Sequence, residues 1–403
     1  MKKKQKVLTL TSIILSLFFL MGLCNISVKA EPLTKSDRAE IKAIKSDLNI
    51  DAKSALLIEP SSGKVIFEKN SHEKLEPASV TKIMTMLLSM EAVDSGKISL
   101  SDKVTVSENA KKMGGSSMLL DTGEVRTVED LLKGIGIASG NDAAVAMAEY
   151  LSGSEESFVD LMNKKAQQLG MKDTVFKNCT GLSAEGHYTT AYDIGIMSRE
   201  LLKHPTILKY TGTYMETISE GRKSPIELVN HNKLVRFFNG CDGLKTGFTS
   251  SAKYCISATS VRDGVRMLAI VMGSPTYKVR NKDASMLMNY GFSKYSSKNV
   301  FKKGDEVERV NLSKSGNRYF IAKASADLNV VFEKGKDNKV TYRSVIDKNK
   351  KEYRKNQKVG YCDVYVNGEL AGKVDLSSDR NVKKPGVFWN LKDNIRNVFP
   401  QGI

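Results

Sequence analysis

The most constraining feature of this chain is an apolar run from Ile83 to Met90 whose residues fall on nearly every side of a helical wheel. A helix of this kind is predicted to be buried rather than to lie at the surface. Pro77 suits its first turn, and Gly96 follows its expected end. The rest of the chain must therefore supply elements that cover this helix on all sides.

A single charge, Lys82, lies within this segment between Pro77 and Glu91. A buried ammonium group is costly unless it is paired or loses its proton. Ser79 stands three residues earlier, so both side chains are expected on one face near the positive end of the helix. The pair predicts a serine nucleophile activated by a lysine whose pKa is lowered by burial. A lysine that reaches solvent from an amphipathic helix is the alternative, and Ser-x-x-Lys alone does not decide between them.

The first thirty residues have the layout of a secretory signal peptide. Lysines near the N-terminus precede an apolar run from Val7 to Leu23, and Val28-Lys29-Ala30 offers a small-residue cleavage site. Residues 1–30 are therefore predicted to direct export. Because they carry five lysines and no acid, the remaining chain keeps +12 of the net charge of +17. This charge suits anionic wall polymers and an anionic membrane surface outside a bacterial cell, and it does not require nucleic acid as a partner.

The order of expected elements indicates an α+β fold. Two short strands at 55–59 and 64–68 flank a turn ending at Gly63, and later strands are expected at 243–248, 254–259 and 265–271. Helices are expected between them at 128–137, 142–151, 157–169 and 191–202, and after them at 278–291. This pattern predicts one antiparallel sheet whose early and late strands meet, with helices covering its faces.

The composition changes near Ser293. From there to Lys384 short alternating runs replace helical periods, and Asn367-Gly368 is a strong hairpin signal. We therefore expect a catalytic domain over 31–295 and a small all-β domain over 296–385. In the tail, 386–403, apolar residues at helical spacing predict an amphipathic helix. It either lies on an anionic membrane surface or docks on its own domain.

Two further motifs join Ser79-x-x-Lys82 in the expected catalytic domain, and the three become specific through their order: Ser79-x-x-Lys82, Ser139-Gly140-Asn141 and Lys245-Thr246-Gly247. This set resembles the penicillin-binding proteins and serine β-lactamases. The surrounding residues, 78–85, 138–143 and 242–249, make the chain most similar to the low-molecular-mass D-alanyl-D-alanine carboxypeptidases, in particular the sporulation-associated type of Gram-positive spore formers. The resemblance covers residues 52–293 and weakens over the β domain and tail, which that family also carries. It implies a penicillin-binding-protein fold.

The resemblance also implies roles for the catalytic residues. Ser79 would attack the carbonyl between the last two D-alanines while Lys82 takes its proton, and water would release the acyl-enzyme. Ser139 would pass a proton to the departing D-alanine amine, with Lys245 nearby. The backbone N–H groups of Ser79 and Phe248 match the family's oxyanion hole.

A second group of residues is implied to bind substrate. Asn141 would hold a substrate amide and contact Lys82, and Thr246 would bind the terminal carboxylate in an electropositive setting created by Lys245. Arg280 aligns with an arginine that helps to hold this carboxylate, although a helix-surface arginine is the alternative. The substrate-binding set is predicted as Asn141, Lys245, Thr246, Gly247, Phe248 and Arg280.

Other features of the sequence leave alternatives open. Asn230-His231-Asn232 matches an Asn-x-Asn element near the family's site, but a pair of turn asparagines explains it as well. Cys179 stands where relatives generally carry proline, which affects loop stiffness and makes a reactive thiol conceivable. The chain has no C-x-x-C pair, so free buried thiols are favoured over a Cys241–Cys255 bridge. The pair His187 and Asp193 is reminiscent of zinc D,D-peptidases, yet no complete metal shell is readable, and neither a metal nor a cofactor is expected.

The resemblance therefore implies a serine D-alanyl-D-alanine carboxypeptidase that trims peptidoglycan pentapeptide stems and is inhibited covalently by β-lactams. Its expected location is the outer face of the cytoplasmic membrane or the cell wall. A β-lactamase is one alternative, but no Glu-x-x-Leu-Asn loop follows Asn141, so slow release of the β-lactam is expected. A non-catalytic wall-binding module is another alternative, favoured by the charge and the β domain. A transpeptidase is the third, and the cleavable-looking signal argues against it.

Overall fold

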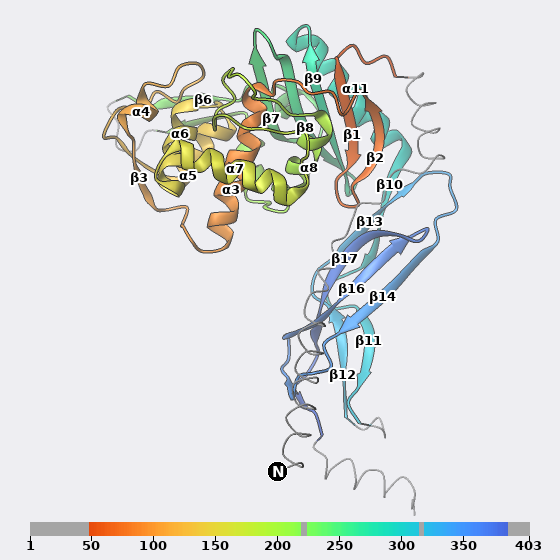
Figure 1. Ribbon diagram of the computed structural model, residues 1–403. Helices are drawn as coiled ribbons and strands as arrows, with labels where there is room; N and C mark the ends of the chain where they lie inside the picture. The colour runs from red at the N-terminus through yellow and green to blue at the C-terminus, as the bar shows by residue number, and fades with distance from the viewer. Residues whose placement is uncertain (1–47, 219–223, 314–317, 386–403) are drawn as a thin grey trace, which may run out of the picture. The chain divides into compact units, whose positions relative to one another are not determined.

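The computed structural model describes residues 48–218, 224–313 and 318–385 (Figure 1). The predicted signal peptide, 1–30, and the predicted amphipathic tail, 386–403, lie outside the described residues. Within the described ranges, no helix has both the length and the apolarity needed to cross a membrane.

A five-stranded sheet with the order β2-β1-β9-β8-β7 forms the centre of the catalytic part. All of its neighbouring strands are antiparallel, and Leu57 lies opposite Ala269. The early hairpin therefore pairs with the late strands, as the sequence predicts. The strands are β1 (Ser54–Glu59), β2 (Lys64–Lys69), β7 (Cys241–Thr249), β8 (Lys253–Arg262) and β9 (Val265–Ser274).

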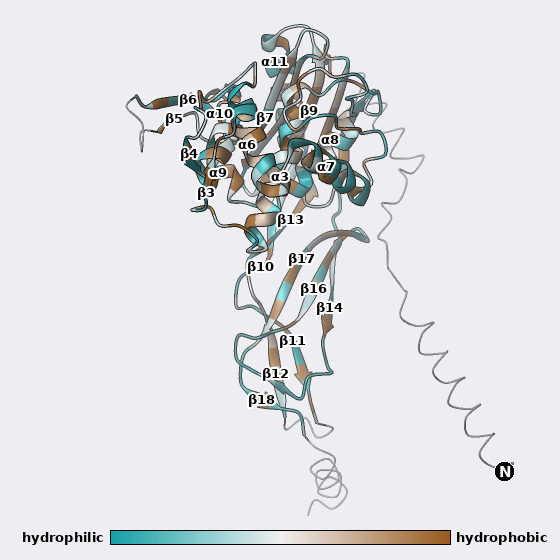
Figure 2. Cartoon of the chain, turned by 60° about the vertical axis from the view of Figure 1, so that its left-hand side comes forward, coloured by the Kyte–Doolittle hydropathy of each residue, from teal (hydrophilic) through white to brown (hydrophobic). Residues whose placement is uncertain are grey.

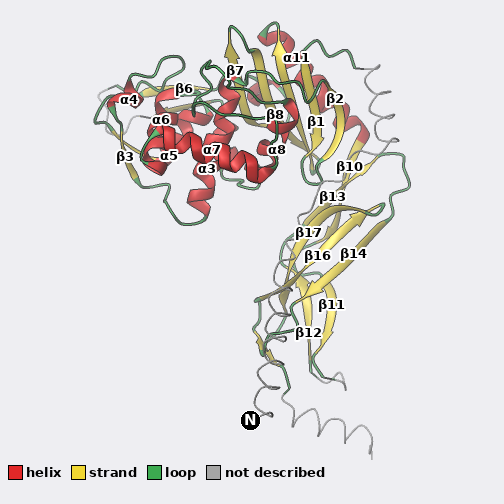
Figure 3. Cartoon of the chain, viewed as in Figure 1, coloured by secondary structure: helices red, strands yellow, loops and turns green. Residues whose placement is uncertain are grey.

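Both faces of this sheet are buried. Successive residues of a strand point to opposite faces, so one inner strand contributes side chains to two different cores. Leu56 and Ile58 belong to the apolar core formed with the helices of one side. Ala55 and Leu57 belong to a second core, which they share with apolar residues of α11 (Tyr277–Lys294). Helices thus cover both faces of the sheet (Figure 3), and the predicted α+β architecture is confirmed.

The remaining helices follow from local signals that the sequence carries. The side chain of Thr127 accepts a hydrogen bond from the Asp130 N–H, and the Asp130 carboxylate accepts one in return, which forms a capping box at the start of α5. Gly170 ends α7 in the left-handed conformation, as expected of a terminal glycine. These helices are α3 (Lys82–Asp94), α4 (Glu108–Lys111), α5 (Val128–Gly136), α6 (Asn141–Ser152), α7 (Glu155–Leu169), α8 (Ala191–Leu201), α9 (Ile207–Thr211) and α10 (Leu234–Phe237).

Two short hairpins between the helices were not expected from the sequence. One pairs β3 (Lys103–Thr105) with β4 (Val125–Thr127), and the other pairs β5 (Met215–Ile218) with β6 (Ile226–Val229). Strands of three or four residues contain too few positions for an alternating pattern to be recognised. The expectation that strands return only near residue 243 is therefore wrong in this detail.

An all-β region follows α11, and its first strand starts at Tyr295, one residue before the predicted boundary. Its main sheet has the order β11-β12-β17-β16-β14 around a core that includes Phe320, Val364 and Leu376. Asn367 and Gly368 both have positive φ and form the predicted turn between β16 and β17. The strands are β10 (Tyr295–Phe301), β11 (Glu306–Asn311), β12 (Tyr319–Ala324), β13 (Leu328–Glu333), β14 (Val340–Ile346), β15 (Glu352–Tyr353), β16 (Lys358–Val366), β17 (Glu369–Ser378) and β18 (Val382–Lys383).

Candidate active site

Ser79 lies in a 3-10 turn, Ala78–Thr81, that leads directly into α3. The N–H of Val80 donates to the carbonyl of Pro77 at 3.2 Å, the i to i+3 bond of such a turn. The expectation that Ser79 opens an α-helix is therefore corrected by one turn, because α3 itself begins at Lys82. The predicted burial is confirmed: the residues of α3 from Lys82 to Met90 are all buried.

The ammonium group of Lys82 is the centre of the site, and its side chain is 0% exposed. Nζ donates to Ser79 Oγ at 3.1 Å, to Asn141 Oδ1 at 2.5 Å and to the carbonyl of Thr180 at 2.7 Å. The alternative in which Lys82 reaches solvent is therefore wrong. Two of the three partners are neutral acceptors from distant segments, and the third is the hydroxyl predicted to be the nucleophile.

Burial lowers the pKa of Lys82 to about 7, against an ordinary value of 10.5. Desolvation is the largest cause, since it penalises the charged form, and the smaller influences of Cys179 and Asp142 act in the opposite direction. A large fraction of the amine is therefore unprotonated near neutral pH. An unprotonated amine 3.1 Å from a serine hydroxyl can accept its proton.

The Ser139-Gly140-Asn141 segment lies immediately before and at the first turn of α6. The amide of Asn141 bridges two segments, because Oδ1 accepts from Lys82 while Nδ2 donates to the carbonyl of Gly114 at 2.6 Å. Ser139 is buried and has a φ of +62°, a conformation that a non-glycine residue seldom adopts. The predicted contact between Asn141 and Lys82 is present in the structure.

Asp142 is a residue of the site region to which the sequence analysis assigned no role. Its buried carboxylate accepts hydrogen bonds from Ser117 Oγ and from the backbone N–H groups of Met118 and Leu120. This carboxylate therefore holds the loop that follows Gly114, which supplies the partner of Asn141. The signal that identified Lys82, one charge at the start of an apolar helix, is also present at Asp142 and could have found it.

Strand β7 brings Lys245-Thr246-Gly247 against the turn that carries Ser79. A Cβ atom added at Gly247 would lie 2.9 Å from both the Pro77 carbonyl oxygen and the Ser79 nitrogen. Only glycine permits this approach, which explains why the third residue of the motif has no side chain. The backbone of β7 thus runs beside the nucleophile, and the next residue, Phe248, is 53% exposed.

The cations of the site lie close enough to affect one another. Lys245 is buried, and its pKa is lowered well below the ordinary value, first by desolvation and then by Lys82 and Arg280. Arg280 on α11 is also buried, which rules out the helix-surface alternative, and its guanidinium donates twice to Asn281 Oδ1. Burial lowers the pKa of Arg280 to about 10. Such a group of desolvated cations favours an anionic ligand group.

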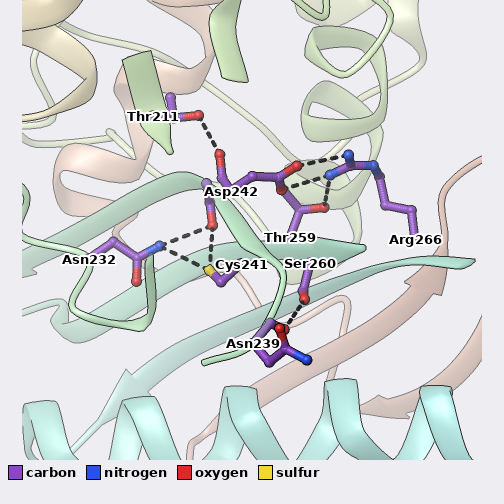
Figure 4. Close-up of polar contacts among 9 residues, drawn as sticks. Thr211, Asn232, Asn239, Cys241, Asp242, Thr259, Ser260 and Arg266 are labelled. Carbon is purple, nitrogen blue, oxygen red and sulfur yellow. Dashed lines mark hydrogen bonds and ion pairs between the residues drawn. The ribbon is translucent and has the colours of Figure 1, made fainter. Parts of the chain in front are cut away.

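Side chains anchor the first residues of β7 (Figure 4). Asp242 forms a two-point ion pair with Arg266, and its carbonyl accepts from Thr211 Oγ1. Asn232 Nδ2 donates to the Gly243 carbonyl at 3.0 Å, and the Asn232 N–H donates to Asn230 Oδ1. In the structure, the Asn-x-Asn element therefore supports the strand that carries Lys245.

The loop that supplies the Thr180 carbonyl also contains Cys179 and His187. Cys179 is buried, and desolvation raises the pKa of its thiol well above the ordinary value, which disfavours a reactive thiolate. His187 contacts Thr81 across 3.0 Å and so connects this loop to the turn of Ser79. The four cysteines in the described ranges, Cys179, Cys241, Cys255 and Cys362, are free and buried, as expected.

The pair His187 and Asp193 does not form a metal site in the structure. Asp193 accepts from Thr174 Oγ1 and from the Asp173 N–H, whereas His187 contacts Thr81. Across the part of the chain that the structure describes, no three His, Cys, Asp or Glu side chains are grouped so that they could hold a metal ion.

The sheet with helices on both faces, together with a Ser-x-x-Lys turn beside a Lys-Thr-Gly strand, defines the class of the penicillin-binding proteins. Comparison with family models narrows this class. Residues 41–276 match the model of D-alanyl-D-alanine carboxypeptidases, and residues 295–384 match the C-terminal domain of penicillin-binding protein 5. The chain belongs to the D-alanyl-D-alanine carboxypeptidase family, and this activity is favoured over a β-lactamase or a non-catalytic wall-binding module.

Individual relatives agree with this assignment. The chain is 45% identical to the D-alanyl-D-alanine carboxypeptidase DacF of Bacillus subtilis over 349 residues, which is 86% of this chain and 90% of the relative. Penicillin-binding protein 5 of Haemophilus influenzae aligns with a TM-score of 0.63 at 31% identity, covering 83% of this chain and 98% of that structure. Penicillin-binding protein D2 of Listeria monocytogenes, in its ampicillin-bound form, aligns with a TM-score of 0.55 at 32% identity, covering 61% of this chain and 99% of that structure.

Proposed function

We propose that this chain is a serine carboxypeptidase that removes the terminal D-alanine of peptidoglycan pentapeptide stems through an acyl-enzyme on Ser79. The observation that carries the proposal is the environment of Lys82. Its amine is fully buried, lies 3.1 Å from Ser79 Oγ, and has a pKa lowered to about 7. A buried lysine of this kind is a suitable general base for a serine hydroxyl.

The acylation step uses these groups in sequence. Lys82 Nζ takes the proton of Ser79 Oγ as Oγ bonds to the carbonyl carbon between the two D-alanines. The carbonyl oxygen becomes an oxyanion, which the N–H groups of Ser79 and Phe248 would stabilise. The C–N bond then breaks as Ser139 would pass its proton to the departing D-alanine nitrogen and take up the proton held by Lys82. Water then attacks the ester carbonyl and gives one proton to Lys82, which returns it to Ser79 Oγ as the ester C–O bond breaks and the shortened stem leaves.

The substrate carboxylate is assigned to the cationic side of the site. Thr246 would donate to it, while Lys245 and Arg280 supply positive potential from buried positions. Without a ligand, desolvation lowers the pKa of Lys245 and of Arg280. A bound carboxylate would raise the pKa of both groups and so offset this effect. Asn141 would hold a backbone amide of the stem with the part of its side chain that Lys82 leaves free.

A β-lactam would acylate the same serine. The Listeria relative described above binds ampicillin, which supports the proposal for this chain. No Glu-x-x-Leu-Asn loop follows Asn141 to provide a general base for rapid deacylation, so the penicilloyl enzyme is expected to persist. Covalent inhibition, rather than antibiotic destruction, is the proposed outcome.

We also propose that the protein acts outside the cytoplasm. The layout of residues 1–30 supports export, and the periodicity of 386–403 supports attachment of a C-terminal helix to the anionic outer face of the membrane. The catalytic and all-β domains are proposed to span 31–295 and 296–385. The resemblance to carboxypeptidases of spore formers supports a role in sporulation.

The catalytic proposal is tested with the chain from Glu31 onward. This protein should release D-alanine from diacetyl-Lys-D-Ala-D-Ala and should bind labelled penicillin at Ser79. Ser79→Ala should abolish both, whereas Ser101→Ala, which changes an exposed serine, should retain both. Release of D-alanine by Ser79→Ala, or a label on another residue, would refute the assigned nucleophile. Rapid nitrocefin turnover would instead support the β-lactamase alternative.

A further inference from the structure

The end of the all-β region that carries β18 is unusually basic. Two segments, 347–358 and 379–384, contain nine Lys and Arg residues and three acidic residues, a net charge of +6. The structure brings them together, since β15 pairs with β18 and the Lys384 N–H donates to the Lys351 carbonyl at 2.8 Å. The loops beside β18 are coloured as hydrophilic in Figure 2. We call these two segments the basic end.

Most cations of the basic end have no acidic partner among the residues that the structure describes. Three do: Arg354 pairs with Glu352, Arg380 with Asp379, and Lys358 with Asp375. In the described part of the chain, no carboxylate lies within ion-pair distance of the other six lysines, of which five are exposed and Lys350 is half-buried. These six are Lys348, Lys350, Lys351, Lys355, Lys383 and Lys384. Their mutual repulsion opposes folding, so the arrangement favours an external anionic partner.

The basic end is held in place by the core beneath it. Tyr353 is buried, stacks at 4.5 Å from the ring of Phe320, and donates its hydroxyl hydrogen to the Asp347 carbonyl at 3.0 Å. Lys384 Nζ donates to the Lys348 carbonyl at 3.1 Å, which links the two segments a second time. The lysines therefore belong to a backbone that is already ordered. Binding an anionic surface would order few further backbone residues, so the entropic cost of binding would be small.

We propose that the basic end docks on the head groups of anionic phospholipids. The sequence that follows favours lipid over an anionic polymer, because the chain leaves the basic end at Lys384 and continues into apolar residues that include Val387, Phe388 and Trp389. Lysines beside apolar and aromatic residues suit the lipid interface, where charge and apolar surface are satisfied together. A polymer dissolved in water would use only the lysines. This proposal rests on the membrane location proposed above, but not on the catalytic function.

The test measures binding of the chain from Glu31 onward to phosphatidylcholine vesicles with and without phosphatidylglycerol. Binding should require phosphatidylglycerol and weaken as salt shortens the Debye length. Changing Lys348, Lys350, Lys351 and Lys355 together to glutamine should lower the partition coefficient by about 100-fold, at roughly fivefold for each lysine with some loss of additivity. A matched control changes four exposed lysines of the catalytic part to glutamine, namely Lys103, Lys164, Lys172 and Lys209.

The outcomes separate the possibilities. A large loss in the basic-end variant, with little loss in the control, supports the proposal. Equal losses in both variants would overturn it, because they would show a response to net charge alone. Unchanged vesicle binding in the basic-end variant, with lost binding to soluble poly(glycerol phosphate), would overturn the lipid assignment. Both variants should hydrolyse the soluble peptide like the parent, which verifies folding independently of membrane binding.

Discussion

The two regions of the molecule use positive charge in opposite ways. In the catalytic region, Lys82, Lys245 and Arg280 are almost completely buried, and desolvation lowers the pKa of each. In the basic end, lysines such as Lys351 and Lys355 are exposed and have no acidic partner among the described residues. The net charge of the whole chain therefore does not reveal whether the cations of either region are buried or exposed.

The difference shows that the environment, and not the residue type, decides what a lysine does. Burial penalises the ammonium form, so it converts Lys82 into a group that can exchange a proton near neutral pH. Exposure in water leaves the charge in place and makes it available to an external anion, with an energy that salt reduces. The following predictions test this contrast, beginning with the largest expected effect.

Lys82→Arg should lower kcat/KM for D-alanine release by about 10³-fold, because a guanidinium group keeps the charge but cannot act as a base at neutral pH. The rate of acylation by labelled penicillin should fall in parallel, and a thermal melt should verify that the variant is folded. Lys164→Arg, which changes an exposed lysine of α7, should match the parent. Near-normal acylation by a folded Lys82→Arg protein would exclude Lys82 as the base.

The pH profile should report the lowered pKa of Lys82. Because the unprotonated amine is the active form and its pKa is about 7, kcat/KM should rise with pH and level off above that value. Below it, each pH unit should cost about tenfold in rate. An exposed lysine would place the rising limb near 10.5 instead. Measurement at constant ionic strength distinguishes the two, and a profile that rises only at alkaline pH would contradict the role given to burial.

Asp142→Asn should lower the free energy of unfolding by about 1–3 kcal/mol, since an amide has one accepting oxygen, whereas Oδ1 of the carboxylate accepts from the Ala143 N–H and Oδ2 accepts from Ser117 and Leu120. Chemical denaturation measures this change. Glu149→Gln alters a carboxylate on the same helix that contacts Asn109 at the surface, and its effect should stay within about 0.5 kcal/mol. Equal effects of the two changes would show that burial of Asp142 is unimportant for the loop.

Lys351→Gln should have the smallest effect. Lys351 is exposed and has no ion-pair partner within the described ranges, so its loss should change the free energy of unfolding by less than about 0.5 kcal/mol. Hydrolysis of a soluble peptide should be unchanged, as measured by D-alanine release. A clear loss of stability would mean that the basic end serves the fold, and the contrast between the two regions would then fail.

Much of the architecture was predictable because its signals are local. The hairpin of β1 and β2, the capping box at Thr127 and the Asn367-Gly368 turn each depend on a few consecutive residues. The order of elements along the chain predicted that early and late strands meet in one sheet, and the structure shows that they do so through β1 and β9. The short hairpins escaped prediction because three or four residues do not establish a period.

The sequence motifs named the side chains of the candidate site, and the resemblance implied the contact between Asn141 and Lys82, but the backbone partners in the site were not predictable. Ser79, Lys82, Asn141 and Lys245 were identified from their motifs. The Thr180 carbonyl and the Gly114 carbonyl were not, because any residue type offers a backbone oxygen and the composition carries no sign of its use. Asp142 was overlooked although its charge in an apolar helix was visible.

By itself, the sequence determined that the apolar helix after Ser79 is buried, since no orientation would leave only polar residues exposed. It also placed one lysine and one serine three residues apart at the start of that helix. Only the tertiary structure decided that this lysine also contacts the Thr180 carbonyl, which lies 98 residues away along the chain. The tertiary structure likewise decided the pKa of Lys82, since desolvation depends on the complete set of surrounding atoms.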